Sequence, residues 1–387
     1  MKQIYLDNAA STPIDPKVLT TICEQEKNNF GNSASLHSFG DTANQVLEKS
    51  RKIIANFLNA DTNEIIFTAS ATESNNLVLK GVCEESQDKG KTIIISAIEH
   101  DSIINQATQL KEKGFKIKFA PVDKFGVVKL KELKKLINND TILVSIIHAN
   151  NEIGTIQPIK KIANICQQKN ILFHTDASQS FGKLPIDIKN LGVDLLTASS
   201  HKIYGPKGAA LLYVKTGIKI KPQLLGGGQE FNLRASTVNI PAIAGFAEAV
   251  KIAKQKMKKE NLETRQLTNN FIKKITKIIP GLQLTGHPKK RLPNIISFLF
   301  SGIEGESILM SLNELGVAVS TGSACSSKNL EPSHVLQACG FSQDKIHGSI
   351  RISLGRFTKK EEIDYLIKIL PPIIEKLRKI SPYGNKK

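Results

Sequence analysis

Residues 193–214 read VDLLTASSHKIYGPKGAALLYV, in which two apolar runs enclose a polar turn. The runs at 193–199 and 208–214 have the length and composition of buried strands. Five similar runs precede them: EIIFT (64–68), TIIIS (92–96), FKIKFAPV (115–122), TILVSII (141–147) and ILFHTD (171–176). Because segments of helical character lie between most of these runs, we predict an α/β fold with a mainly parallel seven-stranded sheet covered by helices.

A second set of apolar runs follows a long basic helical segment at about 241–279: NIISFLF (294–300), VAVS (317–320) and SIRISLG (349–355). A last helix is expected from about residue 359. We predict a smaller α+β C-terminal domain here, since 387 residues are enough for two domains. The expected large cofactor-binding domain spans 15–255, and the small domain takes 1–14 and 256–387.

The composition limits the classes of partner. The formal net charge is +18, from 53 Lys and Arg against 35 Asp and Glu, but lysine is spread along the chain without a basic stripe interleaved with aromatic residues. We therefore expect a solvated surface that favours acidic partners and no direct nucleic-acid binding. No run reaches about 18 apolar residues, so we expect no membrane span. The first residues lack signal-peptide features, so we expect the chain to begin at Met1 in the cytoplasm.

The cysteines do not suggest a metal centre. Five cysteines form no CxxC pair, which argues against a disulfide framework or a zinc site. Cys23, Cys83 and Cys166 fall in segments of helical periodicity and are expected to be packing residues. Cys325 instead stands in STGSACSSKN (320–329), among small polar residues; from the residues alone it is either a reactive or an inert loop thiol.

Polar side chains follow the predicted strands at their carboxyl ends. Ser70 and Glu73 match a capping box at the start of the helix ATESNNLVLKGV (71–82), whose first turn is a potential anion site. The other segments at this edge are Glu99–His100, Asn150–Glu152, Asp176 with Gln179, and Ser199–Lys202. Since open α/β sheets bind ligands at the carboxyl ends of their strands, we predict a cofactor pocket there.

Lys202 indicates which cofactor the pocket holds. It directly follows a strand, between small hydroxyl residues and a Gly-Pro turn, which restrains its amine. Such a lysine can form a Schiff base with an aldehyde cofactor, and Asp176, 26 residues upstream, can pair with a pyridinium nitrogen. Alone, Lys202 would be interpreted as a surface lysine, but the combined pattern predicts pyridoxal 5'-phosphate.

Nearly the whole chain resembles the cysteine desulfurases of the NifS/IscS type, in the class V aminotransferase branch of the fold-type I pyridoxal phosphate enzymes. The motifs that carry this resemblance are YLDNAAST (5–12), ATESNN (71–76), AIEHDSI (97–103), NNEIGTIQPI (150–159), HTDASQSFGK (174–183), SSHKIYGPKG (199–208), GSACSS (322–327), EPSHVL (331–336) and SIRISLGRFT (349–358). Their number and order make the match specific.

The resemblance implies a role for each matching residue. Lys202 would bind the cofactor aldehyde and then act as the base at Cα, with Asp176 on the pyridine nitrogen and His100 stacked on the ring. Gln179 and Asn151 would lie near the phenolic oxygen. The phosphate would be held by Ala71, Thr72, Ser199 and His201, with Thr237 from the partner subunit of a homodimer. Arg351, with Asn151, would bind the substrate carboxylate.

The implied reaction converts L-cysteine to L-alanine and leaves the sulfur on Cys325 as a persulfide. An iron–sulfur scaffold protein, a carrier for tRNA thiolation or another acceptor would then take it; no metal site is expected beyond transient iron–sulfur ligation by Cys325. The alternatives are a selenocysteine lyase, a class V aminotransferase, and a basic nucleic-acid-binding or scaffold protein without catalysis. Ser236 in RAST (234–237) and Ser70 in SAT (70–72) replace usual glycines, which bears on the phosphate contacts.

Overall fold

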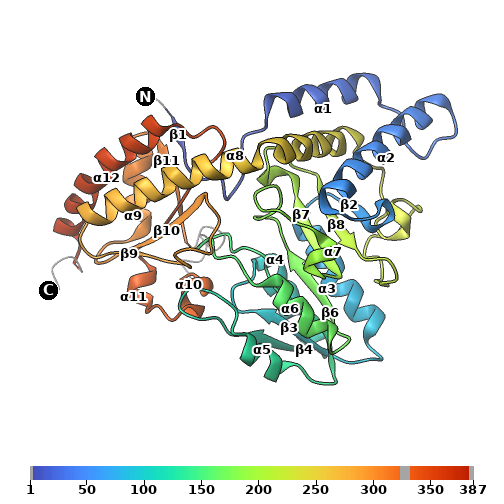
Figure 1. Cartoon of the computed structure of the whole chain (residues 1–387), viewed down its shortest axis with the longest axis horizontal. Helices are drawn as coiled ribbons and strands as arrows, with labels where there is room; N and C mark the ends of the chain where they lie inside the picture. Colours follow the sequence, from blue (N-terminus) through green and yellow to red (C-terminus); the bar gives the residue numbers. More distant parts are fainter. Residues whose placement is uncertain (1–2, 323–331, 383–387) are drawn as a thin grey trace.

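The computed structural model describes residues 3–322 and 332–382, and it confirms the predicted α/β fold (Figure 1). A seven-stranded sheet has the order β2-β8-β7-β6-β5-β3-β4. Its strands are β2 (Ile65–Thr68), β3 (Thr92–Ser96), β4 (Lys116–Ala120), β5 (Thr141–Ser145), β6 (Leu172–Asp176), β7 (Leu195–Ser199) and β8 (Ala210–Val214). Only β8 runs antiparallel to its neighbours, so the sheet is mainly parallel, as predicted.

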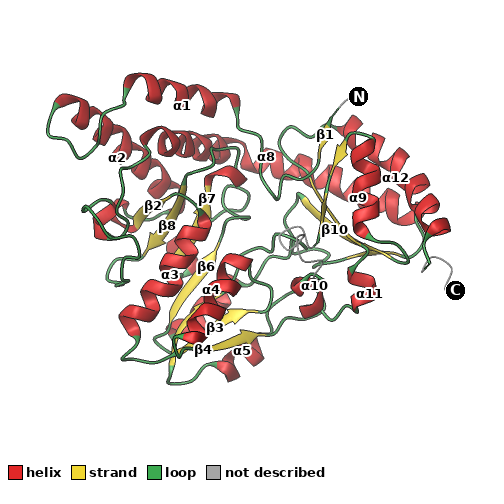
Figure 2. Ribbon diagram, turned by 180° about the vertical axis from the view of Figure 1, so that it is seen from behind, coloured by secondary structure: helices red, strands yellow, loops and turns green. Residues whose placement is uncertain are grey.

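Both faces of this sheet are buried, which explains why its strands have continuous apolar runs. Within β3, Ile94 belongs to one core cluster while Ile93 and Ile95 belong to the cluster on the opposite face. One face packs against α2 (Ser38–Leu58), α5 (Leu130–Leu136), α6 (Ile159–Gln167), α7 (Ile188–Leu191) and the first part of α8 (Ile240–Ile278). The other face, turned towards the viewer in Figure 2, is covered by α3 (Ala71–Ser86) and α4 (Asp101–Glu112).

A second core cluster lies around the four-stranded antiparallel sheet β12-β13-β10-β9. These strands are β9 (Leu282–Leu284), β10 (Ile295–Phe300), β12 (Ser320–Thr321) and β13 (Ser349–Ser353). They pack with α9 (Gly305–Glu314), α12 (Lys360–Ile380) and the second part of α8, so this 39-residue helix joins the two cores (Figure 1). The remaining helices are α1 (Pro16–Asn28), α10 (His334–Ala338) and α11 (Gln343–Ile346).

The N-terminal strand β1 (Ile4–Tyr5) pairs in parallel with β11 (Val317–Ala318), far along the chain. The prediction of one strand over 317–320 is therefore wrong in detail. The segment forms two short strands, β11 and β12, which pair with different partners on either side of Val319. The separate cores are compatible with the predicted domain boundaries, which stay predictions.

The burial of the cysteine side chains agrees only in part with the prediction. Cys83 and Cys166 are buried, and burial raises the pKa of each thiol to about 12. Cys23 is exposed, so its assignment as a packing residue is wrong; α1 buries Val18 and leaves most of its surface to solvent.

In the described part of the chain, no helix has the length and apolar character needed to cross a bilayer.

Candidate active site

A cavity of about 460 Å³ lies at the carboxyl edge of the large sheet. It is lined by all the predicted cofactor- and substrate-binding residues except Thr237: Ala71, Thr72, His100, Asn151, Asp176, Gln179, Ser199, His201, Lys202 and Arg351. The residues come together because β3, β5, β6 and β7 run parallel and end at this edge. Thr237 is exposed and lies outside the cavity of its own chain.

Asp176 ends β6 and is almost fully buried. Its Oδ1 accepts hydrogen bonds from the Ser178 backbone N–H at 2.8 Å and the Ser178 hydroxyl at 2.6 Å. Its Oδ2 accepts one from Asn75 Nδ2 at 2.8 Å. Donors on both oxygens fix the carboxylate, which points into the cavity as an acceptor.

Asn75 was not predicted as a site residue, although it belongs to the quoted motif ATESNN. Besides Asp176, its Nδ2 donates to Ser102 Oγ at 2.9 Å. The backbone N–H of Ser102 donates to His100 Nδ1 at 3.1 Å, which assigns the ring hydrogen to Nε2 in the neutral imidazole. Asn75 thus links the carboxylate and the imidazole that the sequence predicted as cofactor residues.

Lys202 lies in the short 3₁₀ turn η2 (Ser200–Lys202) immediately after β7. Its Nζ donates to the backbone carbonyls of Ala9 at 2.6 Å and Ala10 at 2.7 Å. The turn requires glycine at 205, because a Cβ there would collide with Ser200 Oγ. The motif SSHKIYGPKG therefore holds the amine at the cavity wall, in contact with the N-terminal segment.

Gln179 is oriented by contacts on both ends of its amide. Its Nε2 donates to the Ala9 carbonyl at 2.8 Å, and its Oε1 accepts from Lys183 Nζ at 3.4 Å. Burial and the neighbouring Lys202 lower the pKa of Lys183 to about 7. Lys183 was not predicted as a site residue either.

The start of α3 forms one corner of the cavity, with Ala71 and Thr72 in its first turn, and a helix N-terminus of this kind suits an anion. Ser70 Oγ accepts the Glu73 backbone N–H at 3.1 Å, as the capping box predicts. The second hydrogen bond of the predicted capping box, from the Ser70 backbone N–H to the Glu73 side chain, is wrong. Glu73 Oε2 accepts instead from the backbone N–H of Ala69. His201 also lines the cavity, and burial and the neighbouring Lys202 lower its pKa to about 4.

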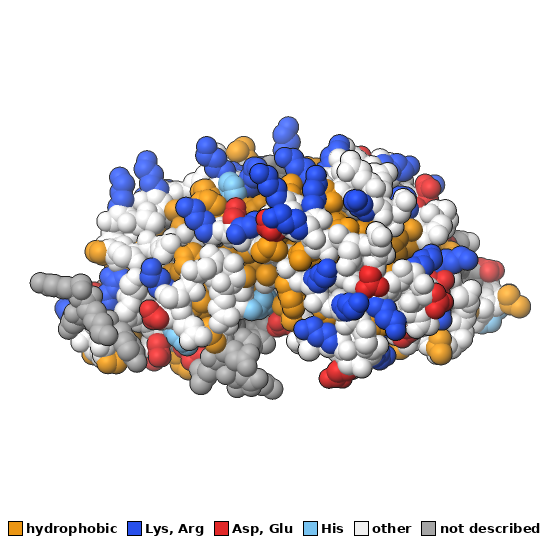
Figure 3. Space-filling model, turned by 90° about the horizontal axis from the view of Figure 1, so that it is seen from below, with side chains coloured by type: hydrophobic (Ala, Val, Ile, Leu, Met, Phe, Trp, Pro, Cys, Tyr) orange, Lys and Arg blue, Asp and Glu red, His pale blue; other side chains and the backbone are white. Residues whose placement is uncertain are grey.

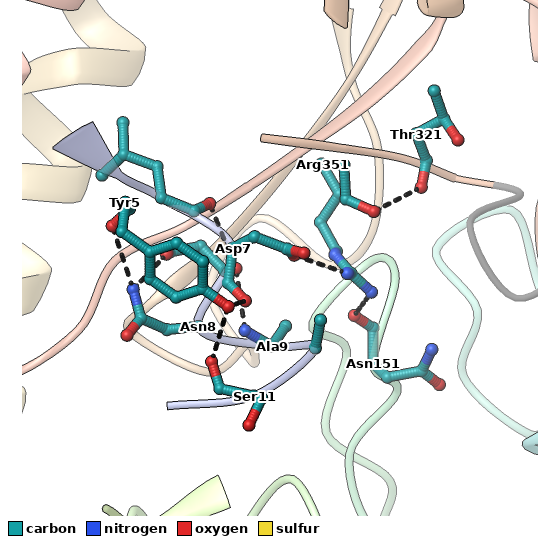
Figure 4. Close-up of polar contacts among 12 residues, drawn as sticks. Tyr5, Asp7, Asn8, Ala9, Ser11, Asn151, Thr321 and Arg351 are labelled. Atoms are coloured by element: carbon teal, nitrogen blue, oxygen red, sulfur yellow. Dashed lines mark hydrogen bonds and ion pairs between the residues drawn. The ribbon is translucent and has the colours of Figure 1, made fainter. Parts of the chain in front are cut away.

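Arg351, on β13, forms the wall contributed by the smaller sheet (Figure 4). Its Nη2 pairs with Asp7 Oδ1 at 2.8 Å and its Nη1 donates to the Asn151 carbonyl at 3.2 Å. Asp7 was missed in the sequence. Arg356, five residues further along the chain, pairs with Asp15 at 2.7 Å and with Glu260 at 2.6 Å, which makes it a structural residue.

Cys325 lies outside the described residues. A second cavity of about 300 Å³ shares His100 and Asn151 with the first and is also lined by Gly322 and Ser333. Three other histidines have structural contacts: His148 with Ser180, His174 with Ser145 and Thr197, and His334 with the Glu99 carbonyl. Within 3–322 and 332–382, no three His, Cys, Asp or Glu side chains gather as metal ligands would.

The chain belongs to the aminotransferase class-V family, whose pattern matches residues 4–366. Among curated relatives, it is 46% identical over 378 residues to cysteine desulfurase IscS 1 of Archaeoglobus fulgidus, covering 98% of each chain. It is 45% identical to cysteine desulfurase IscS of Methanosarcina thermophila, covering all of this chain and 95% of the relative.

Solved structures agree with this assignment. A NifS-like protein superposes with a TM-score of 0.92 at 38% identity, covering 97% of this chain and all of that one. A structure described as SspA in complex with cysteine has a TM-score of 0.81 at 33% identity, covering 92% of this chain and all of that one. The predicted resemblance to NifS/IscS-type enzymes is therefore confirmed.

Proposed function

We propose that the chain is a pyridoxal-phosphate-dependent cysteine desulfurase, which converts L-cysteine to L-alanine and transfers the sulfur to Cys325. The observation that carries this proposal is the meeting of Lys202, Asp176, His100 and Arg351 around one cavity. The names of the relatives and the cysteine-bound structural neighbour support the substrate.

The side chains of the cavity suit pyridoxal phosphate. Lys202 supplies an amine for the aldehyde, Asp176 an acceptor for a protonated ring nitrogen, and His100 a flat group for stacking. The first turn of α3, with Thr72, and His201 suit the phosphate, because these residues line the cavity and a helix N-terminus offers backbone N–H groups to an anion. When bound, the cofactor supplies an electron sink for the pair released as Cα loses its proton.

Arg351, Lys202 and Cys325 have separate roles in the reaction. Arg351 binds the substrate carboxylate and so aligns the Cα–H bond with Lys202 Nζ, which moves the proton. The Cβ–S bond breaks with its electron pair going to carbon, which takes up a proton, while the Cys325 thiolate forms an S–S bond with the departing sulfur. The products are alanine and an enzyme persulfide.

A homodimer is part of the proposal. Thr237 cannot contribute to the phosphate site of its own chain, since it lies outside that cavity. Near it along the chain are the exposed apolar side chains Leu224, Leu225 and Phe231, with exposures of 46%, 84% and 49%. Apolar surface of this kind supports contact with a second copy, which would bring Thr237 to the neighbouring cavity.

The sulfur acceptor is expected to be an acidic protein, such as an iron–sulfur scaffold or a carrier for thiolation, in the cytoplasm. Figure 3 shows Lys and Arg side chains distributed over one face, with fewer Asp and Glu among them. The net charge of +18 would steer an acidic acceptor towards the enzyme, and transfer should weaken as salt rises.

The test is turnover of L-cysteine by the purified enzyme supplied with pyridoxal phosphate, measured as alanine and sulfide in the presence of a thiol reductant. Lys202→Ala should abolish both products, and the exposed control Lys207→Ala should retain them. Equal sulfide release by Lys202→Ala and wild type would refute the proposal. Comparison of cysteine with selenocysteine as substrate tests the lyase alternative.

A further inference from the structure

The contacts of Arg351 limit which of its guanidinium nitrogens a substrate carboxylate can bind. Its side chain is only 4% exposed, and its Nε has neither accessible surface nor a hydrogen-bond partner among the described residues. A ligand entering from the cavity must therefore meet the two Nη atoms. These atoms already bind Asp7 Oδ1 and the Asn151 carbonyl.

Asp7 is held in this position by its backbone. Tyr5 Oη donates to the Asp7 carbonyl at 3.0 Å (Figure 4). Asp7 also forms a parallel bridge with Ser353, two residues beyond Arg351 on the same strand. The flanking Asn8 donates from Nδ2 to the Ser353 carbonyl at 2.9 Å. The backbone of Asp7 is thus fixed beside the guanidinium, and its side chain, 20% exposed, borders the cavity.

We propose that the Asp7 carboxylate competes with the substrate carboxylate for Arg351. It thereby weakens the binding of amino acids to the enzyme and speeds the release of the product alanine. The proposal rests on the proposed function, because it takes Arg351 as the carboxylate site. An incoming carboxylate either displaces Asp7 or binds beside it, and in both cases the negative charge of Asp7 opposes it. Neutralising that charge strengthens amino-acid binding.

The segment that carries Asp7 also contacts Lys202. The carbonyls of Ala9 and Ala10, two and three residues further on, accept the hydrogen bonds of Lys202 Nζ. Residues 7–10 therefore contact both the carboxylate-binding arginine and the amine. Asp7 acts through Arg351 and is a positioning residue, since no direct contact with the reacting atoms is required of it.

Three substitutions separate charge from shape. Asp7→Asn keeps an oxygen that can accept from Arg351 Nη2 but removes the charge, and Asp7→Glu keeps the charge on a longer side chain. Asp88→Asn is the matched control, because Asp88 is exposed and does not line the cavity. Each holoenzyme is titrated with L-alanine by calorimetry and by the visible absorption of bound pyridoxal phosphate, and KM and kcat for cysteine are measured separately.

Asp7→Asn should bind L-alanine about tenfold more tightly than wild type and show a lower KM for cysteine, with kcat unchanged or reduced by slower product release. Asp7→Glu and Asp88→Asn should stay within about twofold of wild type. Unchanged or weaker alanine binding by Asp7→Asn would overturn the inference. A wild type that binds alanine but makes none from cysteine would instead overturn the proposed function, because the Asp7 inference is decided by the affinities alone.

Discussion

The loop that leads to Thr237 depends on one buried ion pair. Arg51 on α2 donates from Nη1 and Nη2 to the two carboxylate oxygens of Glu230, both at 2.8 Å. The side chains are 3% and 2% exposed. Glu230 also accepts the Phe67 backbone N–H at 2.7 Å, and Arg51 donates to the Ile65 carbonyl at 2.6 Å. This pair therefore ties the loop to β2.

The same pair holds a strained turn, η3 (Glu230–Asn232). Glu230, Phe231 and Asn232 have φ angles of 48°, 57° and 64°, in the left-handed region that non-glycine residues disfavour. Such a backbone persists only when its surroundings fix it, and here the fixing contacts come from Glu230 itself.

Glu230→Ala should lower the free energy of unfolding by about 5 kcal/mol. Breaking a buried pair from one side costs about 3–5 kcal/mol, because the guanidinium loses its counter-charge. The buried Phe67 N–H also loses its acceptor, which lowers the free energy of unfolding by about 1–3 kcal/mol. With a urea m-value of about 3–4 kcal/mol/M for a chain of this size, the midpoint should fall by more than about 1 M.

The assay is urea unfolding followed by circular dichroism, with the double variant Arg51→Met/Glu230→Leu as the matched comparison. The double variant should be about 2 kcal/mol more stable than Glu230→Ala, because no charge is then left buried without a partner. A loss below about 1 kcal/mol in Glu230→Ala, or a double variant less stable than the single one, would show that this ion pair does not hold the loop.

Other changes have equally definite outcomes. Ser236 has φ 128°, so Ser236→Gly should raise stability by about 1 kcal/mol, seen as a higher urea midpoint; a lower midpoint would contradict the strain. Burial lowers the pKa of His148 and His174 to about 4, against about 6.5 when unfolded. At these two histidines the unfolded state binds more protons, which lowers stability as pH falls from about 6.5 towards 4. Glu99, whose pKa burial raises to about 8, acts in the opposite direction, but it is one group against two. Stability should therefore decline over this range, and a urea midpoint that stays constant or rises would contradict the prediction. Asn75→Ala should weaken pyridoxal phosphate binding about tenfold in a fluorescence titration, with Asn76→Ala as control, because Asp176 loses a charge-assisted hydrogen bond. Arg351→Ala should raise KM for cysteine at least about tenfold, and an unchanged KM would move the carboxylate site elsewhere.

The large sheet was predictable because both of its faces are buried. Each strand then needs apolar side chains on both sides, as Ile93, Ile94 and Ile95 show, and a continuous apolar run results. The cavity was predictable for a related reason. Parallel strands end at one edge, so polar residues just after the strands, such as Asp176 and Lys202, must meet there.

Asp7 could not be predicted in the same way. It meets Arg351 because β1 joins β11 and the following residues join β13, a pairing across 344 residues that no local pattern encodes. Asn75 lies on a helix whose motif was recognised, but its bond to Asp176 depends on how α3 packs over the sheet. A signal for Ser236 was present, since the glycine usual at that position implies the positive φ that the structure has.

A single turnover shows directly whether Cys325 accepts the sulfur of cysteine. The enzyme, loaded with pyridoxal phosphate and free of reductant, is mixed with less than one equivalent of L-cysteine, and alanine is measured while the protein is mapped by mass spectrometry. We predict alanine in amounts equal to the cysteine added and the mass of one extra sulfur atom on the peptide that contains Cys325, neither of which Lys202→Ala should show. Alanine formed with the extra sulfur on Cys23 or on no cysteine would show that Cys325 is not the acceptor, and no alanine at all would show that the protein is not a cysteine desulfurase.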